Sequence, residues 1–323
     1  MRALVTRSFG TPPAMIVESR PVPVDQDGET VVRIRAATIN QLSNTVRTGQ
    51  VGVAKAPLVL GNEAAGTVVS SAKFAAGTAV VVYGAGQLGM TEDGLQQEYV
   101  RVSDKRVFAL PDGLDFDTGS ALTVNYITAY RALTRVAQIE AGQTVLIPGA
   151  TGALGHALMQ TAQVFGARPI AVVSTASKAA RARQAGAERV IDLSTGDLLA
   201  EVARLTGGVG ADIALDPVGG EMTGRLLAAL RPRAAVVAIG FAGGVTASFD
   251  LVDLIVHEKR VVGYDLHLES DRDAELAFAW ISRYAAAGKL RPLIDSMFTL
   301  ANFEAGFQRL TSRQACGAIV LQL

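Results

Sequence analysis

Hydrophobic residues follow two different patterns along the 323-residue chain. Residues 1–116 hold short Val-rich or alternating runs between Gly, Pro and Asp, such as TVVRIRAAT at 30–38 and TAVVVYG at 78–84. Such runs predict β-strands joined by turns. Residues 117–136 carry apolar positions at helical spacing and predict a helix that links this β-rich part to the next.

From residue 144 onward, short apolar runs alternate with segments of helical periodicity. TVLIP at 144–148 predicts a buried strand, and ALGHALMQTAQVFG at 153–166 predicts a helix. Further strands are predicted at 169–174, 189–193, 211–216, 235–240 and 260–266, and further helices at 177–186, 222–231 and 273–288. This alternation is typical of an α/β fold with a doubly wound parallel sheet covered by helices.

The composition narrows the class of protein. The chain is 49% hydrophobic and 19% charged, which favours a well-packed globular protein over disorder. Thirty basic residues balance thirty acidic ones, so no net field recruits nucleic acid or an anionic membrane. No apolar run reaches the ~18 residues of a membrane span, and MRALVTRSFG reads as a strand and turn rather than a signal peptide. A single cysteine, Cys316, fits a reducing compartment, and we expect a cytoplasmic protein without nucleic-acid or membrane partners.

A glycine-rich turn separates the first strand of the alternating part from its helix. The sequence GATGALGH at 149–156 is one glycine short of the full GxGxxG fingerprint. Gly152 would let the backbone approach a pyrophosphate, and Gly155 would let the helix pack close to the sheet. The amides at the start of that helix would bind the phosphates. The turn therefore predicts a dinucleotide site that includes Ala150, Thr151, Gly152, Ala153 and Leu154.

The second strand of this part indicates which dinucleotide binds. An NAD site usually carries an acidic residue about 20 residues past the glycines, but no carboxylate occurs between Glu140 and Glu188. Ser174, Thr175 and Lys178 stand there instead, and hydroxyls with a cation suit the 2′-phosphate of NADPH. Arg183, on the same predicted helix, is expected to be solvated surface.

The supply of metal ligands is small. Tight zinc sites draw three or four ligands from Cys, His and carboxylates. The chain has one cysteine and three histidines, His156, His257 and His267, with no ligand-like spacing among them. The sequence therefore predicts that no zinc site is present.

Several motifs together resemble one family over essentially the full chain. They are INQLSN with RTG (39–49), GNEAAGTVV (61–69), TAYRAL (128–133), GATGALGHALMQTAQVFGA (149–167), GAERVIDL (186–193), DPVGG (216–220), AIGFAGG (238–244) and SRQACGAIVL (312–321). With them the chain resembles the medium-chain dehydrogenase/reductase superfamily, in particular the zinc-independent NADPH:quinone oxidoreductase branch that includes zeta-crystallin. The resemblance implies a GroES-like catalytic domain at 1–118 and 268–323, with a Rossmann domain at 119–267 inserted in it. It also implies a homodimer, and a cofactor in the cleft between the domains.

The resemblance also bears on Asn62 and Glu63, two polar residues in an otherwise apolar segment. Zinc-dependent members carry a histidine ligand at the position of Asn62, a cysteine at that of Asn40 and a further cysteine near Val124. Zinc activates an alcohol by withdrawing charge from its oxygen, whereas hydride delivery to a quinone or an enone needs no such activation. The resemblance thus implies an NADPH-dependent reductase of quinones or activated C=C bonds. Asn62 is expected to bond the backbone or Glu63.

The same resemblance suggests further site residues. Asn40, Asn125 and Thr128 are candidates to orient the nicotinamide or to polarise the acceptor oxygen, and Tyr126 or Tyr264 is a possible proton donor. The remaining cofactor contacts would be Val218, Ile239, Gly240, Phe241, Tyr264, Leu266 and Arg313. Leu193 cannot supply the hydroxyl that a tyrosine gives to the adenosine phosphate in some relatives.

Two other functions stay open. The segments around Asn62 and Asn125 are also similar to mitochondrial-type 2-enoyl thioester reductases. Those enzymes place a tyrosine where this chain has Val51, so their proton donor would be missing. A non-enzymatic NADPH-binding protein is the third possibility, because fold alone does not fix function.

Overall fold

The computed structural model describes residues 1–323, which divide into two compact units. The first comprises Met1–Ile127 with Leu266–Leu323, and the second is Thr128–Asp265. The second unit is therefore an insertion in the first, and the α/β class with a parallel sheet inserted in a β-rich domain is confirmed. The domain boundaries expected at 119 and 267 lie near those of the two units.

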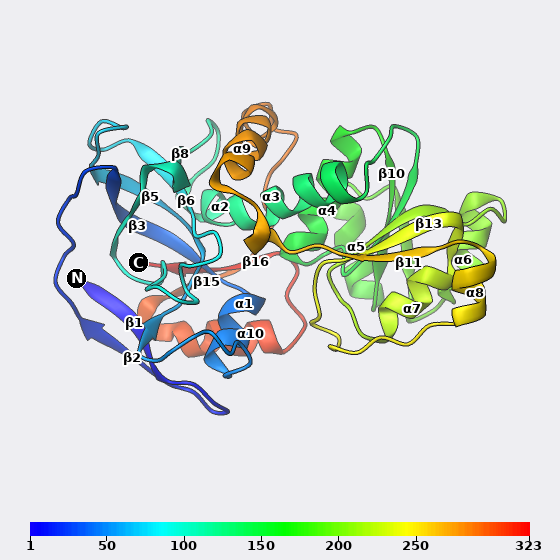
Figure 1. The fold of residues 1–323 in the computed structure, drawn as a ribbon, viewed down its shortest axis with the longest axis horizontal. Helices are drawn as coiled ribbons and strands as arrows, with labels where there is room; N and C mark the ends of the chain where they lie inside the picture. Colours follow the sequence, from blue (N-terminus) through cyan, green and yellow to red (C-terminus); the bar gives the residue numbers. More distant parts are fainter. The chain divides into compact units, whose positions relative to one another are not determined.

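The first unit is built on two sheets whose strands are antiparallel except for the parallel pair β15 and β16 (Figure 1). Its larger sheet has seven strands in the order β15-β16-β3-β5-β6-β8, with β7 paired to β3, and its smaller sheet has the order β2-β1-β4. The larger sheet comprises β3 (Glu29–Ile39), β5 (Glu63–Ser70), β6 (Ala79–Tyr83), β7 (Tyr99–Ser103), β8 (Val107–Ala109), β15 (Ile294–Thr299) and β16 (Ala318–Gln322). The smaller sheet comprises β1 (Arg2–Ser8), β2 (Ala14–Ser19) and β4 (Leu58–Val59).

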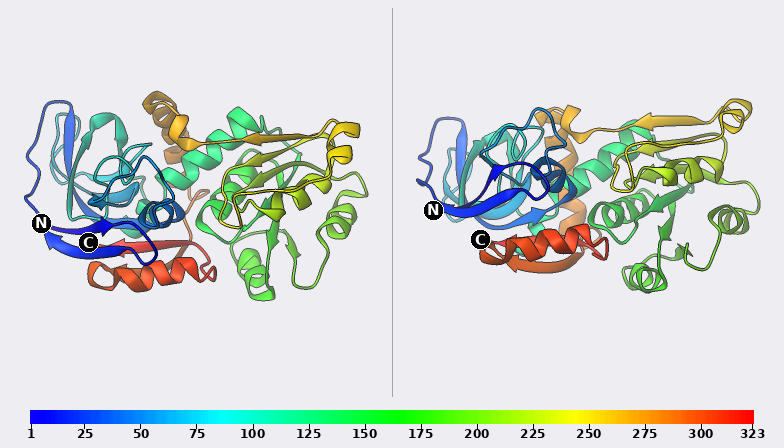
Figure 2. Two further views of the ribbon diagram at one scale, coloured as in Figure 1. Left: turned by 60° about the horizontal axis from the view of Figure 1, so that its bottom comes forward. Right: turned by 90° about the horizontal axis from the view of Figure 1, so that it is seen from below.

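Helices complete the first unit. Figure 2 shows α10 beside strands β15 and β16 at the C-terminal end of the chain, and their contacts agree with this. The helices are α1 (Gln41–Arg47), α2 (Phe116–Ser120), the start of α3 (Thr123–Arg131), α9 (Asp271–Ala286) and α10 (Phe303–Thr311). None of the helices in the chain combines the length and hydropathy needed to cross a lipid bilayer.

The pairing of β3 with β5 brings two distant stretches of sequence together. Ala37 lies opposite Ala64 in the antiparallel register, and β5 also pairs with β6, where Glu63 lies opposite Tyr83. Gly66 makes this pairing possible, because a Cβ there would lie 2.2 Å from the carbonyl oxygen of Arg33. The end of β3, the start of α1 and the start of β5 therefore meet in one place.

The second unit carries one parallel sheet of six strands in the order β11-β10-β9-β12-β13-β14. Its strands are β9 (Thr144–Pro148), β10 (Arg168–Val173), β11 (Arg189–Asp192), β12 (Ala211–Asp216), β13 (Leu230–Ala238) and β14 (Arg260–Gly263). Its helices are α4 (Ala153–Val164), α5 (Ala176–Gln184), α6 (Leu198–Thr206), α7 (Glu221–Ala228) and α8 (Leu251–Val256). The chain starts at the centre, moves to one edge, and returns to build the other half. The order reverses between β9 and β12, where doubly wound sheets bind their ligands.

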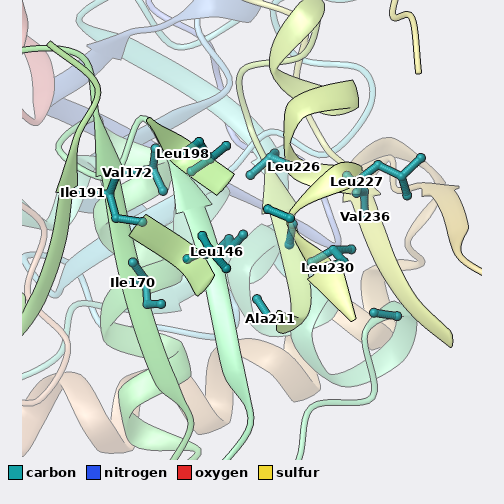
Figure 3. Packing of buried hydrophobic residues seen from close by; sticks show 14 residues of the cluster. Leu146, Ile170, Val172, Ile191, Leu198, Ala211, Leu226, Leu227, Leu230 and Val236 are labelled. Atoms are coloured by element: carbon teal, nitrogen blue, oxygen red, sulfur yellow. The ribbon is translucent and has the colours of Figure 1, made fainter. Parts of the chain in front are cut away.

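Apolar side chains from the sheet and its helices form the core of this unit (Figure 3). Leu146 on β9 and Ile170 on β10 are fully buried, and Leu198 of α6 and Leu226 of α7 belong to the same cluster. Branched aliphatic residues at these positions pack the helices against the sheet. This rigid packing fixes the ends of the strands, where the candidate site residues lie.

The prediction of one continuous helix at 117–136 is wrong. The structure has α2, which ends at Ser120, then α3, and then a π-helical turn at Ala132–Val136. A capping box between Asp115 and Thr118 starts α2, and the carboxylate of Glu63 binds a backbone amide in the first turn of α3. Two separate helix starts therefore replace the single helix that the periodicity indicated.

Candidate functional site

The predicted cofactor residues of the second unit lie at one edge of its sheet. Because all six strands are parallel, their carboxyl ends share that edge. The residues that follow these ends are Ala150, Thr151, Gly152, Ala153 and Leu154 after β9, Ser174, Thr175 and Lys178 after β10, Val218 after β12, Ile239, Gly240 and Phe241 after β13, and Tyr264 after β14. Leu266 and Arg313 belong to the first unit.

The turn after β9 has the geometry of a phosphate cradle. Gly152 is the N-cap of α4 and offers no side-chain oxygen, so the amides of Ala153, Leu154 and Gly155 have no acceptor in the chain. A Cβ at Gly155 would lie 2.1 Å from the carbonyl oxygen of Gly149, so only glycine lets the turn fold back on the helix. Free amides at the positive end of a helix bind anions. The residues present therefore fit the pyrophosphate of a dinucleotide.

A buried carboxylate organises the neighbouring turn. Asp216, at the end of β12, accepts hydrogen bonds from the amides of Val218 and Gly219 at 2.9 Å and from the Thr223 hydroxyl at 2.7 Å. Its backbone oxygen accepts from the amides of Ile239 and Gly240. The side chain of Asp216 thus holds the DPVGG turn, and its backbone oxygen ties this turn to the chain that leaves β13. The DPVGG motif indicated Val218 as a cofactor contact, but the role of Asp216 was not predicted.

The turn after β10 exposes two hydroxyl groups. Ser174 and Thr175 are exposed, and Lys178 is half-buried at the first turn of α5. Thr175 also has a structural task, because its side chain caps α5 by accepting from the amide of Lys178 at 3.3 Å. Arg183 lies further along α5, close enough to Asp192 for its charge to help hold the pKa of that carboxyl below its usual range, behind the hydrogen bonds from Ser194.

In the first unit, a chain of side-chain hydrogen bonds connects four of the polar residues singled out in the sequence, Asn62, Asn40, Glu63 and Asn125, with Thr38 as the link between Asn40 and Glu63. Asn40 is the N-cap of α1: its Oδ1 accepts from the Ser43 amide at 3.0 Å. Its Nδ2 donates to Oδ1 of Asn62 at 2.7 Å and more weakly to Thr38 at 3.4 Å. Asn62 therefore bonds Asn40, and the expectation that it bonds the backbone or Glu63 through its side chain is wrong. The pairing of β3 with β5 causes this, because it sets α1 directly beside residue 62.

Glu63 is the buried centre of this cluster, with 1% of its surface exposed. Its carboxylate accepts from the Thr38 hydroxyl at 3.0 Å, the Val124 amide at 3.0 Å and Nδ2 of Asn125 at 3.1 Å. Burial raises its pKa from 4.5 to about 7, although these hydrogen bonds act in the opposite direction. A carboxylate in an apolar strand was the sequence signal for this role, but its partners could not be read from the pattern.

The candidate catalytic residues occupy different environments. Asn40 and Asn125 are connected through Thr38 and Glu63, and both are half-buried. Thr128 lies one turn of α3 beyond Asn125 and is 5% exposed. Residues three apart share one face of a helix, so Asn125 and Thr128 lie on the same side of α3.

The two tyrosines considered as proton donors are both buried. Tyr126 is 1% exposed, and burial raises its pKa well above 10, which makes loss of its proton unfavourable. Tyr264 is 6% exposed, with the guanidinium of Arg135 5.3 Å from its ring centre.

Two other residues singled out in the sequence have different surroundings. Arg313 is exposed and has a positive φ of 59°. Leu193 packs against the core of the second unit.

The cluster around Asn62 does not fit zinc. Zinc in proteins prefers thiolate, imidazole and carboxylate ligands. At two of the three positions where the zinc-dependent relatives carry ligands, this chain has the side-chain amides of Asn40 and Asn62, which bond each other. At the third, near Val124, a backbone amide donates to Glu63. No group of three or more His, Cys, Asp or Glu side chains in the chain is placed to hold a metal ion. The chemistry available at this place is hydrogen bonding by amides beside a buried carboxyl group.

Two family models match the chain. "Alcohol dehydrogenase GroES-like domain" matches residues 26–112, in the first unit, and "Zinc-binding dehydrogenase" matches residues 153–283, which include most of the second. The human quinone oxidoreductase is 26% identical over 100% of this chain and 98% of its own length. The human synaptic vesicle membrane protein VAT-1 homolog is 27% identical over 99% of this chain and 86% of its length. The bovine quinone oxidoreductase-like protein 2 is 30% identical over 71% of this chain and 67% of its length.

Solved structures agree on the fold. An NAD-dependent alcohol dehydrogenase superposes with a TM-score of 0.91 at 26% identity, and each chain is covered completely. A quinone oxidoreductase from Pseudomonas syringae pv. Tomato DC3000 has a TM-score of 0.89 at 24% identity, over 100% of this chain and 99% of its own. At that identity the second likeness concerns the fold alone.

Proposed function

Because this chain belongs to the medium-chain dehydrogenase/reductase superfamily and is a quinone oxidoreductase-like member of it, we propose that it is a zinc-independent, NADPH-dependent reductase of quinones or enones. The observation that carries the proposal is the bond between Asn40 and Asn62, where two amides stand in place of metal ligands. Without a Lewis acid, alcohol oxidation loses its activation, whereas reduction of an already electrophilic acceptor does not depend on one.

The residues assign a task to each unit. A bound nicotinamide would supply a hydride from its C4. The free amides at the start of α4 would hold the pyrophosphate, and the turns after β10, β12 and β13 would contact the rest of the cofactor. The polar cluster around Glu63 orients the acceptor, and the proton that balances the hydride comes from solvent.

An acceptor comparison tests the proposal. We expect the purified protein to oxidise NADPH with a small benzoquinone or an enone, and much more slowly with a crotonyl thioester. Val51 supports this preference because the position carries no hydroxyl and its side chain packs against an apolar cluster. Turnover of the thioester alone would replace the proposal with a 2-enoyl thioester reductase. Binding of NADPH without turnover of any acceptor would favour a binding protein.

We propose NADPH rather than NADH because the second strand offers Ser174, Thr175 and Lys178 and no carboxylate. The fold does not decide this, since a similar solved structure is an NAD-dependent enzyme. Lys178→Gln is expected to raise the KM for NADPH about 10-fold and to leave that for NADH unchanged, because a charged hydrogen bond to phosphate is lost. Arg183→Gln removes the same charge from the same helix and is the control. Equal effects of the two variants on NADPH would contradict the assignment.

We also propose a homodimer that pairs through β14, the edge strand of the parallel sheet. An unpaired strand edge can pair with its own copy about a twofold axis. The neighbouring helix α8 has no buried residue although it is largely apolar, with Ile255 63% and Val256 67% exposed.

Val256→Asp is expected to weaken the dimer by about 10-fold or more, because a charge replaces an apolar contact. Light scattering during gel filtration measures this, and Val209→Asp, at a residue that is 63% exposed elsewhere in the unit, is the control. A monomeric wild-type protein, or a Val256→Asp dimer of unchanged stability, would contradict the proposal.

A further inference from the structure

Three asparagine side chains meet around the buried carboxyl group of Glu63, and their hydrogen bonds can be given a direction. Their directions follow from the backbone amide of Ser43, because this group can only donate a hydrogen bond. It donates to Asn40 at 3.0 Å, so the atom of Asn40 that faces it is Oδ1. The other end of the Asn40 side chain is therefore Nδ2, and Asn62, which receives it at 2.7 Å, must present Oδ1. The orientation of both amides follows from one backbone group.

Two acceptors orient Asn125. Its Nδ2 lies 3.1 Å from the carboxylate of Glu63 and 3.1 Å from the carbonyl oxygen of Ala121. Both partners accept hydrogen bonds, so both hydrogens of this nitrogen are used. Only the acceptor Oδ1 of Asn125 is left to meet a ligand.

Nδ2 of Asn40 also uses both of its hydrogens, because it donates to Asn62 and to Thr38. Nδ2 of Asn62, in contrast, donates to no group in the chain. Asn62 is only 2% exposed, and an amide donor that is buried without a partner is unfavourable. Unlike Oε1 of Gln96, which is fully buried and has no partner, Nδ2 of Asn62 keeps some surface that a ligand can reach.

We infer that Nδ2 of Asn62 is the donor that binds and polarises the carbonyl oxygen of the acceptor, and that Asn40 holds it in that orientation. Of the three amides it is the only one with free N–H groups, and a quinone or enone oxygen can only accept. This inference rests on the proposed reductase function. It makes Asn62 a catalytic residue and Asn40 a positioning residue.

The step balances without a metal. A bound nicotinamide would supply a hydride, which would bring two electrons to the electrophilic carbon of an enone or to the ring of a quinone, so that negative charge would grow on the acceptor oxygen. The N–H of Asn62 stabilises that charge, and a proton from solvent completes the reduced product.

Asn40→Asp reverses the orientation of Asn62 and leaves the helix cap in place. Aspartate is a good N-cap and still accepts from the Ser43 amide, but it has no N–H. Asn62 then has to turn its Nδ2 toward Asp at position 40 and its oxygen toward the acceptor. Asn62→Leu has nearly the same volume and removes the donor altogether. Gln41→Glu, on the exposed side of α1, adds the same charge one residue away and is the control.

Kinetics of these variants give the first test. Asn62→Leu and Asn40→Asp are each expected to lower kcat/KM for the quinone and the enone by about 100-fold, and to change the dissociation constant of NADPH by less than about twofold. Combining them is expected to cost no more than Asn62→Leu alone, because Asn40 acts through Asn62. If the double variant loses the product of the two single losses, the positioning role of Asn40 is wrong. If Asn62→Leu keeps the wild-type kcat/KM, the whole inference is wrong.

A vibrational measurement separates this inference from the proposed function, because it needs no turnover. An enone labelled with ¹³C at its carbonyl is bound with NADP⁺, and its C=O stretch is recorded by difference infrared spectroscopy. The inference predicts a lower frequency in the wild-type and Gln41→Glu proteins than in Asn62→Leu and Asn40→Asp. Equal frequencies, or failure of the enone to bind, overturn it. An inactive wild-type protein that still shows the shift contradicts only the proposed reaction.

Discussion

Gly155→Ala is expected to abolish NADPH binding and to destabilise the inserted unit. Alanine normally stabilises a helix relative to glycine by about 1 kcal/mol. Here a Cβ would lie 2.1 Å from the carbonyl oxygen of Gly149, an atom of the backbone that cannot move aside without opening the turn. We expect a loss of about 2–4 kcal/mol in the free energy of unfolding, opposite in sign to the helix propensity. Denaturant titration and NADPH fluorescence measure the two effects.

Two other glycines serve as comparisons for this prediction. A Cβ at Gly152 would lie 3.3 Å from the same carbonyl oxygen, so Gly152→Ala is expected to fold but to bind NADPH more weakly, because the methyl group occupies the approach to the pyrophosphate. A Cβ at Gly52 would meet no atom within 4 Å, and Gly52→Ala is expected to change neither property. A Gly155→Ala protein with wild-type stability and affinity would show that the turn is not closed as the structure has it.

Glu63 is expected to make the protein less stable as the pH rises from about 4.5 to 7. Burial raises its pKa from 4.5 to about 7 in the folded state. Because the folded state holds this proton more tightly than the unfolded one, its contribution to stability is complete below pH 4.5 and is lost as the pH rises through 7. A shift of this size corresponds to about 3 kcal/mol.

The difference in unfolding free energy between wild type and Glu63→Gln isolates this effect. Glutamine does not titrate, and it keeps an acceptor for the Val124 amide, but its N–H₂ would face Nδ2 of Asn125, which is also a donor. This loss is the same at every pH, so the change of the difference with pH reports the ionisation of Glu63. Hydrogen bonds from Arg309 lower the pKa of Asp295 to about 2. The stability that Asp295 contributes is therefore lost only as the pH falls below about 4, outside the range in which Glu63 titrates. We expect Glu63→Gln to gain stability relative to wild type between pH 5 and 8. A difference that does not change with pH would contradict the buried position of Glu63.

Sequence periodicity predicted the inserted unit well because its strands are short, buried and separated by helices. The strands expected at 144–148 and 211–216 have those bounds in the structure. Helix α8 was missed, since it is short and largely apolar yet lies exposed, so it shows no polar face. The helix at 117–136 was predicted as one piece because its break at Ala121 and Leu122 occurs within an apolar stretch.

The candidate site could be predicted only in part, for a similar physical reason. The glycine turn at 149–156 is local, and its residues alone indicated a phosphate cradle. The bond from Asn40 to Asn62 and the three bonds to Glu63 depend on the register of β3 against β5 and on the position of α3. Such long-range contacts leave no periodic trace in the sequence, so the partner of Asn62 was predicted wrongly.

Transfer of deuterium from NADPH to an enone tests the central claim most directly. The protein is incubated with an enone and NADPH that carries deuterium at both C4 positions, and the saturated ketone is analysed by NMR and mass spectrometry. Hydride transfer at this site predicts one deuterium per product molecule, at the β-carbon, with unlabelled hydrogen at the α-carbon from solvent. Oxidation of NADPH without deuterium in the product, or no oxidation of NADPH, would contradict the account.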